Sequence, residues 1–361
     1  MADAALSAPA VAAPEFAALM APFAPFEAHP VLAVAVSGGR DSLALALLAR
    51  DWATARDGRV QALIVDHGLR SDSAIEARTT RERLAALGIA AEILLWPGDK
   101  PSTRIQQAAR QARYRLLFES CCQRGILHLM TAHHADDQSE TVAMRAVRGS
   151  GPDGLAGMAA VVEQRDLRLL RPLLGVLRRR LTATIEARGI AWIDDPSNED
   201  RRFERVRIRQ DGGASGATRD DGRAVRDRTL AEAALGALEL VPGDGVALDH
   251  VAVSGLHEEI AERLLSRVVQ ALAGRDYPPR RDRLRRAAAR LSQGAERGKS
   301  GKSQDFTLSG CQLMLRQDPG TRRLRWIVRR ENGTKHDKEP GQPLVPAAFF
   351  ACGASAAPHL D

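Results

Sequence analysis

The stretch VLAVAVSGGRDSLALALLAR, residues 31–50, decides the fold. Its first six residues are all apolar, which is typical of a strand buried on both faces of a parallel sheet. Two adjacent glycines then interrupt the pattern, and the leucines and alanines that follow predict a helix. Backbone N–H groups can approach an anion closely at the glycines, and the helix start adds further unpaired N–H groups. The unit therefore predicts a phosphate cradle.

The loop SGGRDS lacks the spacing of a Walker A motif and the third glycine of a dinucleotide-binding fingerprint. It resembles the PP-loop of the N-type ATP pyrophosphatases, which cleave ATP between the α and β phosphates. A tight strand-to-helix turn without a ligand is the structural alternative. The predicted ATP-binding residues of the loop are Ser37, Gly38, Gly39, Arg40, Asp41 and Ser42.

Asp41 follows the glycines directly. A carboxylate beside a polyphosphate would be repelled unless a cation bridged the two, so we predict a catalytic role for Asp41 through Mg²⁺ at the pyrophosphate. The alternative is a first-turn acid stabilised by the helix dipole, and it is compatible with that role.

Further apolar runs at 59–65, 89–95 and 126–130 predict strands, and helical segments separate them. This alternation predicts an α/β fold with a doubly wound, mostly parallel sheet. Ligands bind at the carboxyl ends of the strands in such sheets. Three polar segments fall at that edge: SGGRDS, DHGLR at 66–70 and TAHHADDQSET at 131–141.

The segment at 66–70 places Asp66 and His67 where adenine or ribose would lie, with ordinary strand-end polarity as the alternative. Arg110 and Arg113 stand one helical turn apart on the helix expected at 104–124. Their guanidinium groups could pair with phosphates or with a carboxylate, and a solvated helix face is the alternative.

The segment at 131–141 carries two histidines and three acids. Asp137 and Glu140 are three residues apart, so they share one face if the segment is helical, where paired carboxylates could hold an ammonium group, Mg²⁺ or both. His133 or His134 could contact phosphates or carry a proton. His133 is the predicted ATP-binding residue, and His134 is the alternative that the sequence leaves open. Zinc is disfavoured because neighbouring residues seldom chelate one ion together. A solvated polar loop is the remaining alternative.

Composition limits the class of protein. The four cysteines form no Cys-x-x-Cys pair, which favours a reducing cytoplasm, and no apolar run is long enough to cross a membrane. Two blocks are basic: residues 165–209 hold twelve arginines against seven acids, and 275–302 hold ten basic residues against three acids. Such blocks favour a polyanionic partner, with a solvated arginine-rich surface as the alternative.

Composition shifts also predict the domain organisation. The expected parts are a flexible N-terminal lead at 1–30 with a short helix near 16–20, an ATP-binding catalytic domain at 31–210, a linker or mobile loop at 211–228, a smaller mixed α+β C-terminal domain at 229–345 and a tail at 346–361.

Taken together, the motifs resemble the tRNA(Ile)-lysidine synthase family. The matching segments span more than half of the chain: SGGRDS, DHGLR, QQAARQARYRLL at 106–117, TAHHADDQSETVAMRAVRGSGPDGLAGM at 131–158, RPLL at 171–174 and DDPSNED at 194–200. Val206 departs from the family pattern, in which asparagine is usual after the arginine.

The resemblance implies that ATP adenylates the C2 oxygen of the wobble cytidine in an isoleucine tRNA with a CAU anticodon. Free L-lysine then displaces AMP through its ε-amine and leaves lysidine. The implied catalytic residues are Asp41, Arg113, Asp137 and Glu140, of which Asp137 and Glu140 recognise lysine. The implied tRNA-binding residues are Arg201, Arg205, Arg207, Arg209, Arg280, Arg281 and Arg285.

Three rivals differ in chemistry. A tRNA 2-thiocytidine synthetase shares the fold and the target atom, but it would need cysteines for an iron–sulfur cluster. A small-molecule amidating PP-loop enzyme would not need the basic blocks. A nucleotide-binding regulatory module would have no use for the paired carboxylates. The sequence leaves the oligomeric state open, a homodimer included.

Overall fold

A computed structural model describes residues 8–103, 105–147, 152–163, 166–193, 222–241, 245–273, 278–297 and 305–331. The chain divides into two compact units, Met1–Asp220 and Asp221–Asp361. Among the residues in the described ranges, no helix is long and apolar enough to cross a membrane.

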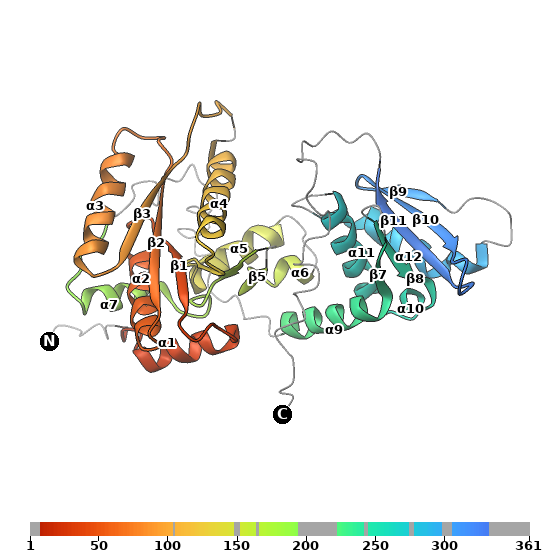
Figure 1. Cartoon of the computed structure of the whole chain (residues 1–361), viewed down its shortest axis with the longest axis horizontal. Helices are drawn as coiled ribbons and strands as arrows, with labels where there is room; N and C mark the ends of the chain where they lie inside the picture. Colours follow the sequence, from red (N-terminus) through yellow and green to blue (C-terminus); the bar gives the residue numbers. More distant parts are fainter. Residues whose placement is uncertain are drawn as a thin grey trace. The chain divides into compact units, whose positions relative to one another are not determined.

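A six-stranded sheet with the order β3-β2-β1-β4-β6-β5 forms the centre of the first unit (Figure 1). Its neighbouring strands run parallel except for the edge strand β5, which is antiparallel to β6. The prediction of a mostly parallel sheet is therefore confirmed. The strands are β1 (Val31–Ala35), β2 (Arg59–Asp66), β3 (Ala90–Leu95), β4 (His128–Met130), β5 (Val161–Glu163) and β6 (Arg168–Leu170).

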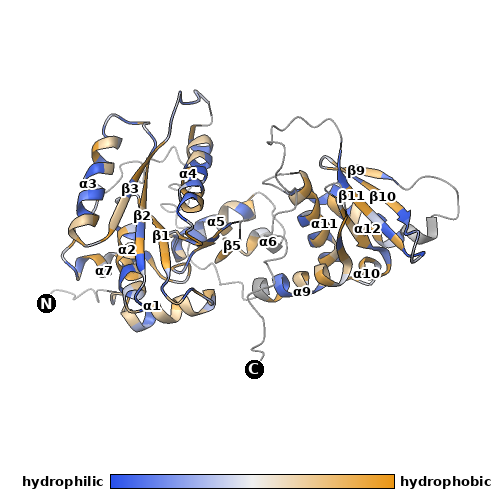
Figure 2. Cartoon of the chain, in the orientation of Figure 1, coloured by the Kyte–Doolittle hydropathy of each residue, from blue (hydrophilic) through white to orange (hydrophobic). Residues whose placement is uncertain are grey.

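Helices cover both faces of this sheet, as a doubly wound fold requires. In β1, Leu32 and Val34 pack with α2 (Arg40–Thr54), α3 (Ser73–Ala86) and α7 (Arg178–Glu186) on one face. Ala33 and Ala35 pack with α4 (Ile105–Gln123) on the other. Figure 2 shows β1 as hydrophobic and many residues of α3 and α4 as hydrophilic. These two helices pack on the sheet with one face and expose the other face to solvent.

The N-terminal segment is part of this core, so the prediction of a flexible lead at 1–30 is wrong for most of its described residues. It forms the helix α1 (Ala13–Met20) and the short 3-10 helix η1 (Ala21–Phe23). Phe16, Met20 and Phe23 are buried in the core because their spacing of four and three residues puts them on one helical face. The short helix predicted near 16–20 is thus present as α1, but the alanine- and proline-rich composition gave no sign that it is buried.

The second unit is a mixed α+β body, as predicted. Its antiparallel sheet has the order β7-β8-β11-β10-β9, and its core surrounds the buried Trp326. The strands are β7 (Leu238–Val241), β8 (Gly245–Asp249), β9 (Phe306–Leu308), β10 (Cys311–Gln317) and β11 (Leu324–Arg330). The helices are α9 (Gly222–Ala237), α10 (His250–Ser254), α11 (Glu258–Ala273) and α12 (Arg281–Arg297).

One boundary differs from the sequence predictions. Helix α9 begins at Gly222, so residues 222–228 are not linker, and the rest of the predicted linker lies outside the described residues. Between β9 and β10 the chain turns at Ser309 and Gly310, which both adopt positive φ angles. The predicted tail at 346–361 also lies outside the described residues.

Candidate functional site

The glycine loop follows β1 and begins α2. Gly38 adopts φ +86°, and a Cβ on it would lie 2.5 Å from Thr80 Oγ1 and 3.3 Å from Ile193 Cδ1, so no other residue fits there without strain. Gly39 is the N-cap of α2 with φ −75°, and a Cβ on it would make only ordinary contacts, the nearest at 3.6 Å to Ser37 Oγ. The two glycines therefore have different roles: Gly38 makes the turn, and Gly39 starts the helix.

Hydroxyl groups tie the loop together. Ser42 Oγ donates to the carbonyl of Gly39 (2.9 Å) and accepts from the backbone N–H of Ser37 (3.2 Å). The carbonyl of Gly38 accepts from the N–H of Ile193 at 3.0 Å. Arg40 stacks with its guanidinium carbon 5.2 Å from the centre of the neighbouring Trp192 ring. The loop is thus fixed by its own hydrogen bonds and by contacts with Trp192 and Ile193.

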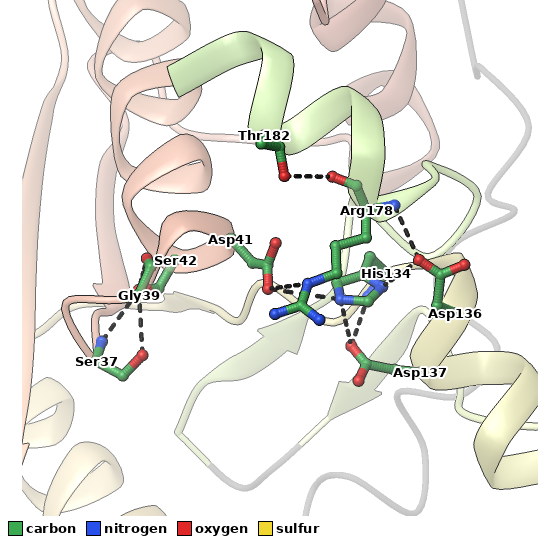
Figure 3. Close-up of polar contacts among 9 residues, drawn as sticks. All are labelled: Ser37, Gly39, Asp41, Ser42, His134, Asp136, Asp137, Arg178 and Thr182. Atoms are coloured by element: carbon green, nitrogen blue, oxygen red, sulfur yellow. Dashed lines mark hydrogen bonds and ion pairs between the residues drawn. The ribbon is translucent and has the colours of Figure 1, made fainter. Parts of the chain in front are cut away.

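A cluster of acids surrounds His134 at the carboxyl end of β4 (Figure 3). Helix α5 (Ala135–Val147) begins directly after this residue, and Asp137 accepts from the His134 backbone N–H at 3.0 Å, as in one half of a capping box. The His134 Nε2 atom lies 3.6 Å from Asp41 Oδ2 and 3.5 Å from Asp137 Oδ2. Its Nδ1 atom lies 3.6 Å from Asp136 Oδ2.

His134 is only 3% exposed. Burial alone would lower the pKa of His134, but the hydrogen bond to Asp41 and the charges of the three surrounding aspartates outweigh it and raise the pKa above its usual value. The His134 imidazole therefore lies between the acids of the β4 end and Asp41 of the glycine loop.

Arg178, the first residue of α7, completes this cluster and was not predicted from the sequence. Its Nε atom lies 3.5 Å from Asp41 Oδ2, and its backbone N–H donates to Asp136 Oδ2 at 3.0 Å. The starts of α2, α5 and α7 therefore meet around Asp41, as Figure 3 shows. Nothing local in the sequence separates Arg178 from the two arginines that follow it.

The other predicted residues of the β4 segment have distinct surroundings. Glu140 lies on α5, three residues after Asp137 as predicted, and is 1% exposed. His133 is half-buried, and its Nδ1 atom lies 3.0 Å from Thr131 Oγ1. Of the two histidines, His134 is the one beside Asp41. That His133 binds ATP stays a prediction.

Asp66 and His67 end β2 at the same edge of the sheet. Asp66 is buried and accepts from the N–H of Gly68 at 2.9 Å. Burial, and after it the positive charge of Arg113 on α4, lower the pKa of His67, and Asp66 opposes this shift. Burial also lowers the pKa of the Arg113 guanidinium. The structure thus brings Arg113 and His67 into the same electrostatic environment.

The predicted tRNA-binding arginines divide into two groups. Those at 201–209 lie outside the described residues. Arg280, Arg281 and Arg285 are exposed at the start of α12 in the second unit, and Arg285 Nε lies 3.7 Å from Glu262 Oε1.

Asp41 fits the predicted Mg²⁺ in one respect. Its Oδ1 atom is buried and has no hydrogen-bond partner among the described residues, whereas its Oδ2 faces His134 and Arg178. An unpaired carboxylate oxygen is a ligand that Mg²⁺ prefers. Within the same part of the chain, no three or more His, Cys, Asp or Glu side chains are grouped to hold a metal ion by themselves.

Comparisons with known proteins show what the chain is similar to. A family model described as "PP-loop domain" matches residues 11–211. The tRNA(Ile)-lysidine synthase of Rhodopseudomonas palustris is 42% identical over 316 residues, which cover 82% of this chain and 91% of that protein. That of Bradyrhizobium sp. is 39% identical over 328 residues, covering 82% and 90%. The solved U34-tRNA thiolase NcsA from Methanococcus maripaludis matches with a TM-score of 0.47 at 16% identity, covering 56% of this chain and 74% of that one.

Proposed function

The chain belongs to the tRNA(Ile)-lysidine synthase family of PP-loop proteins, and on this premise we propose that it joins free L-lysine to the wobble cytidine of tRNA(Ile) in an ATP-dependent reaction. The observation that carries the proposal is the meeting of the glycine loop with Asp41, His134 and Asp137 at one edge of a parallel sheet. Phosphate chemistry and amine chemistry can take place there side by side.

In the first step, the C2 oxygen of the cytidine attacks the α-phosphorus of ATP. The bond from that phosphorus to the oxygen bridging the α and β phosphates breaks, and pyrophosphate leaves. Backbone N–H groups at Gly38 and Gly39 and at the start of α2 would bind the phosphates, and the fixed turn at Gly38 would keep these groups preorganised. Asp41 would hold Mg²⁺ through Oδ1, and the ion would supply positive charge for the departing pyrophosphate.

In the second step, the neutral ε-amine of lysine attacks C2, the bond from C2 to the adenylated oxygen breaks, and AMP leaves. As the new C–N bond forms, the amine nitrogen releases a proton, which a neighbouring carboxylate such as that of Asp137 would accept. Asp137 and Glu140 lie on the same helix beside the loop, so their carboxylates suit a substrate that arrives as an ammonium ion. Arg113 adds a cation at the edge of β2 for a phosphate or for the carboxylate of lysine.

The tRNA itself is assigned to the arginines at 201–209 and to Arg280, Arg281 and Arg285 on the second unit. Arginine side chains bind phosphate without reading sequence, so these residues supply affinity, not choice of tRNA. The proposal places the enzyme in the cytoplasm.

The test is incorporation of labelled lysine into a transcript of tRNA(Ile) with a CAU anticodon in the presence of ATP and Mg²⁺. We expect the wild type to transfer label and Asp41→Asn and Asp137→Asn to lose transfer with an unchanged thermal unfolding profile. Glu82→Gln is the matched control, because Glu82 is exposed on α3 away from the cluster. Label that stays free with the wild type would refute the proposal, and AMP release without tRNA would point to a small-molecule acceptor.

A further inference from the structure

Three consecutive arginines begin α7, and each has a different environment. Arg180 makes two short contacts with Glu15, at 2.6 and 2.7 Å, which fasten α1 to α7. Arg179 is exposed, and no residue that the structure describes pairs with it. Arg178 alone turns toward Asp41 (Figure 3). The side chains of successive helical residues point about 100° apart, so three consecutive arginines can have three different sets of neighbours.

We propose that Arg178 is a positioning residue for the nucleotide-bound Mg²⁺: it fixes the Asp41 carboxylate through Oδ2 so that Oδ1 is presented to the ion. This inference rests on the proposed ATP-dependent function. Arg178 does not touch the reacting atoms in this assignment and acts through Asp41.

The two oxygens of Asp41 are in different environments. Arg178 Nε and His134 Nε2 approach Oδ2 at 3.5 and 3.6 Å, and Oδ1 is buried without a hydrogen-bond partner among the described residues. A half-turn of the carboxylate would only interchange two equivalent oxygens, but any partial rotation would lengthen both approaches. The positive groups on one side therefore fix the plane of the carboxylate and leave its other oxygen for a ligand.

The backbone of Arg178 is itself held in place. Its N–H donates to Asp136 at 3.0 Å, and its carbonyl accepts from Thr182 Oγ1 at 3.3 Å. The guanidinium is thus attached to a helix start that is tied to α5. Groups that orient a metal-binding carboxylate from behind typically change metal affinity by about 10- to 100-fold when they are removed.

A role in stability alone explains the contact poorly. The Arg178 side chain is 27% exposed and its Nε lies 3.5 Å from the carboxylate, and partly exposed pairs at such separation add little to stability. The Arg178 guanidinium therefore acts on the orientation of the Asp41 carboxylate, and through it on metal binding, more than on folding.

The test measures Mn²⁺, used in place of Mg²⁺, by electron paramagnetic resonance in the presence of α,β-methylene-ATP. We expect Arg178→Gln to weaken Mn²⁺ binding by about 10- to 100-fold, while binding of the analogue without metal stays close to that of the wild type. Arg178→Lys should recover part of the loss, since it restores charge without the planar geometry. Arg179→Gln should bind Mn²⁺ normally. Arg180→Gln should lower the unfolding temperature and leave Mn²⁺ binding unchanged.

Equal Mn²⁺ affinity in Arg178→Gln and the wild type would overturn the inference. So would a variant that behaves like Arg180→Gln, losing thermal stability instead of metal affinity. If the wild type binds Mn²⁺ with the analogue and Arg178→Gln binds it equally well, the inference fails but the proposed function stays intact. A wild type that binds neither would refute the proposed function, and the inference would fall with it.

Discussion

Replacing Gly38 with alanine tests the idea that the glycine loop depends on one backbone conformation. Gly38 has φ +86°, outside the regions that residues with a Cβ prefer. A Cβ there would lie 2.5 Å from Thr80 Oγ1. The hydroxyl cannot move aside freely, because it donates to the carbonyl of Glu76 at 2.8 Å.

The expected cost has two parts. A left-handed conformation costs an L-residue about 1–2 kcal/mol. Forcing a methyl group into an occupied space costs about 1–3 kcal/mol more. Gly38→Ala should therefore lower the free energy of unfolding of the first unit by about 2–5 kcal/mol. Gly39→Ala is the matched control, because Gly39 has φ −75° and an added Cβ has its nearest contact at 3.6 Å.

The assay is urea unfolding followed by tryptophan fluorescence, since three of the four tryptophans belong to the first unit. A double variant, Gly38→Ala with Thr80→Ala, removes the steric contact but keeps the backbone strain. Compared with Thr80→Ala alone, the Gly38 substitution should then cost only about 1–2 kcal/mol. If Gly38→Ala unfolds at the same urea concentration as Gly39→Ala, the reasoning from φ and Cβ contact is wrong.

Two further predictions concern residues away from the loop. Burial lowers the pKa of His128, and Arg168 adds to this shift while Glu27 opposes it, so the folded pKa lies below the ordinary 6.5. The unfolded chain then binds the proton more readily: His128 costs no stability above pH 6.5, and stability falls as the pH drops from 6.5 through the folded pKa. His128→Gln should reduce this loss of stability below pH 6.5, measured from unfolding curves at a series of pH values. An unchanged loss would contradict the role given to His128. Separately, Arg281→Gln and Arg285→Gln should each reduce the slope of log affinity for tRNA(Ile) against log salt by about 0.7–0.9, measured by filter binding, and an unchanged slope would remove both from the interface.

The sequence predicted the sheet of the first unit because its signals are local. The apolar run at 31–36 ends at two glycines, and strand and turn lie within ten residues of each other. The strands β5 and β6 went unpredicted because each spans three residues and the polar residues between them interrupt any apolar run, unlike the run 126–130 that contains β4. The N-terminal helix was predicted near 16–20, but its place in the core was not. The surface that buries Phe16 and Met20 comes from elsewhere in the chain, and composition does not record it.

Within the candidate site, the structure brings together two segments that the sequence singled out, but the sequence could not rank neighbouring residues within them. His133 and His134 are adjacent and chemically identical, and what separates them is that α5 begins at Ala135. His134, directly before the helix, is turned inward among the acids. His133 is half-buried beside Thr131. Arg178 lies far from Asp41 in sequence, so only the packing of α7 against α2 brings the two together.

The same packing explains how a site for a polyanion can contain three aspartates. Asp136 and Asp137 each accept from a backbone N–H, at Arg178 and His134 respectively, so part of their charge is neutralised by helix starts. Both also face the raised-pKa imidazole of His134. Asp41 differs from them, since one of its oxygens is buried without a hydrogen-bond partner among the described residues. Asp136 and Asp137 therefore stabilise the helix starts, whereas the buried oxygen of Asp41 is suited to bind an ion.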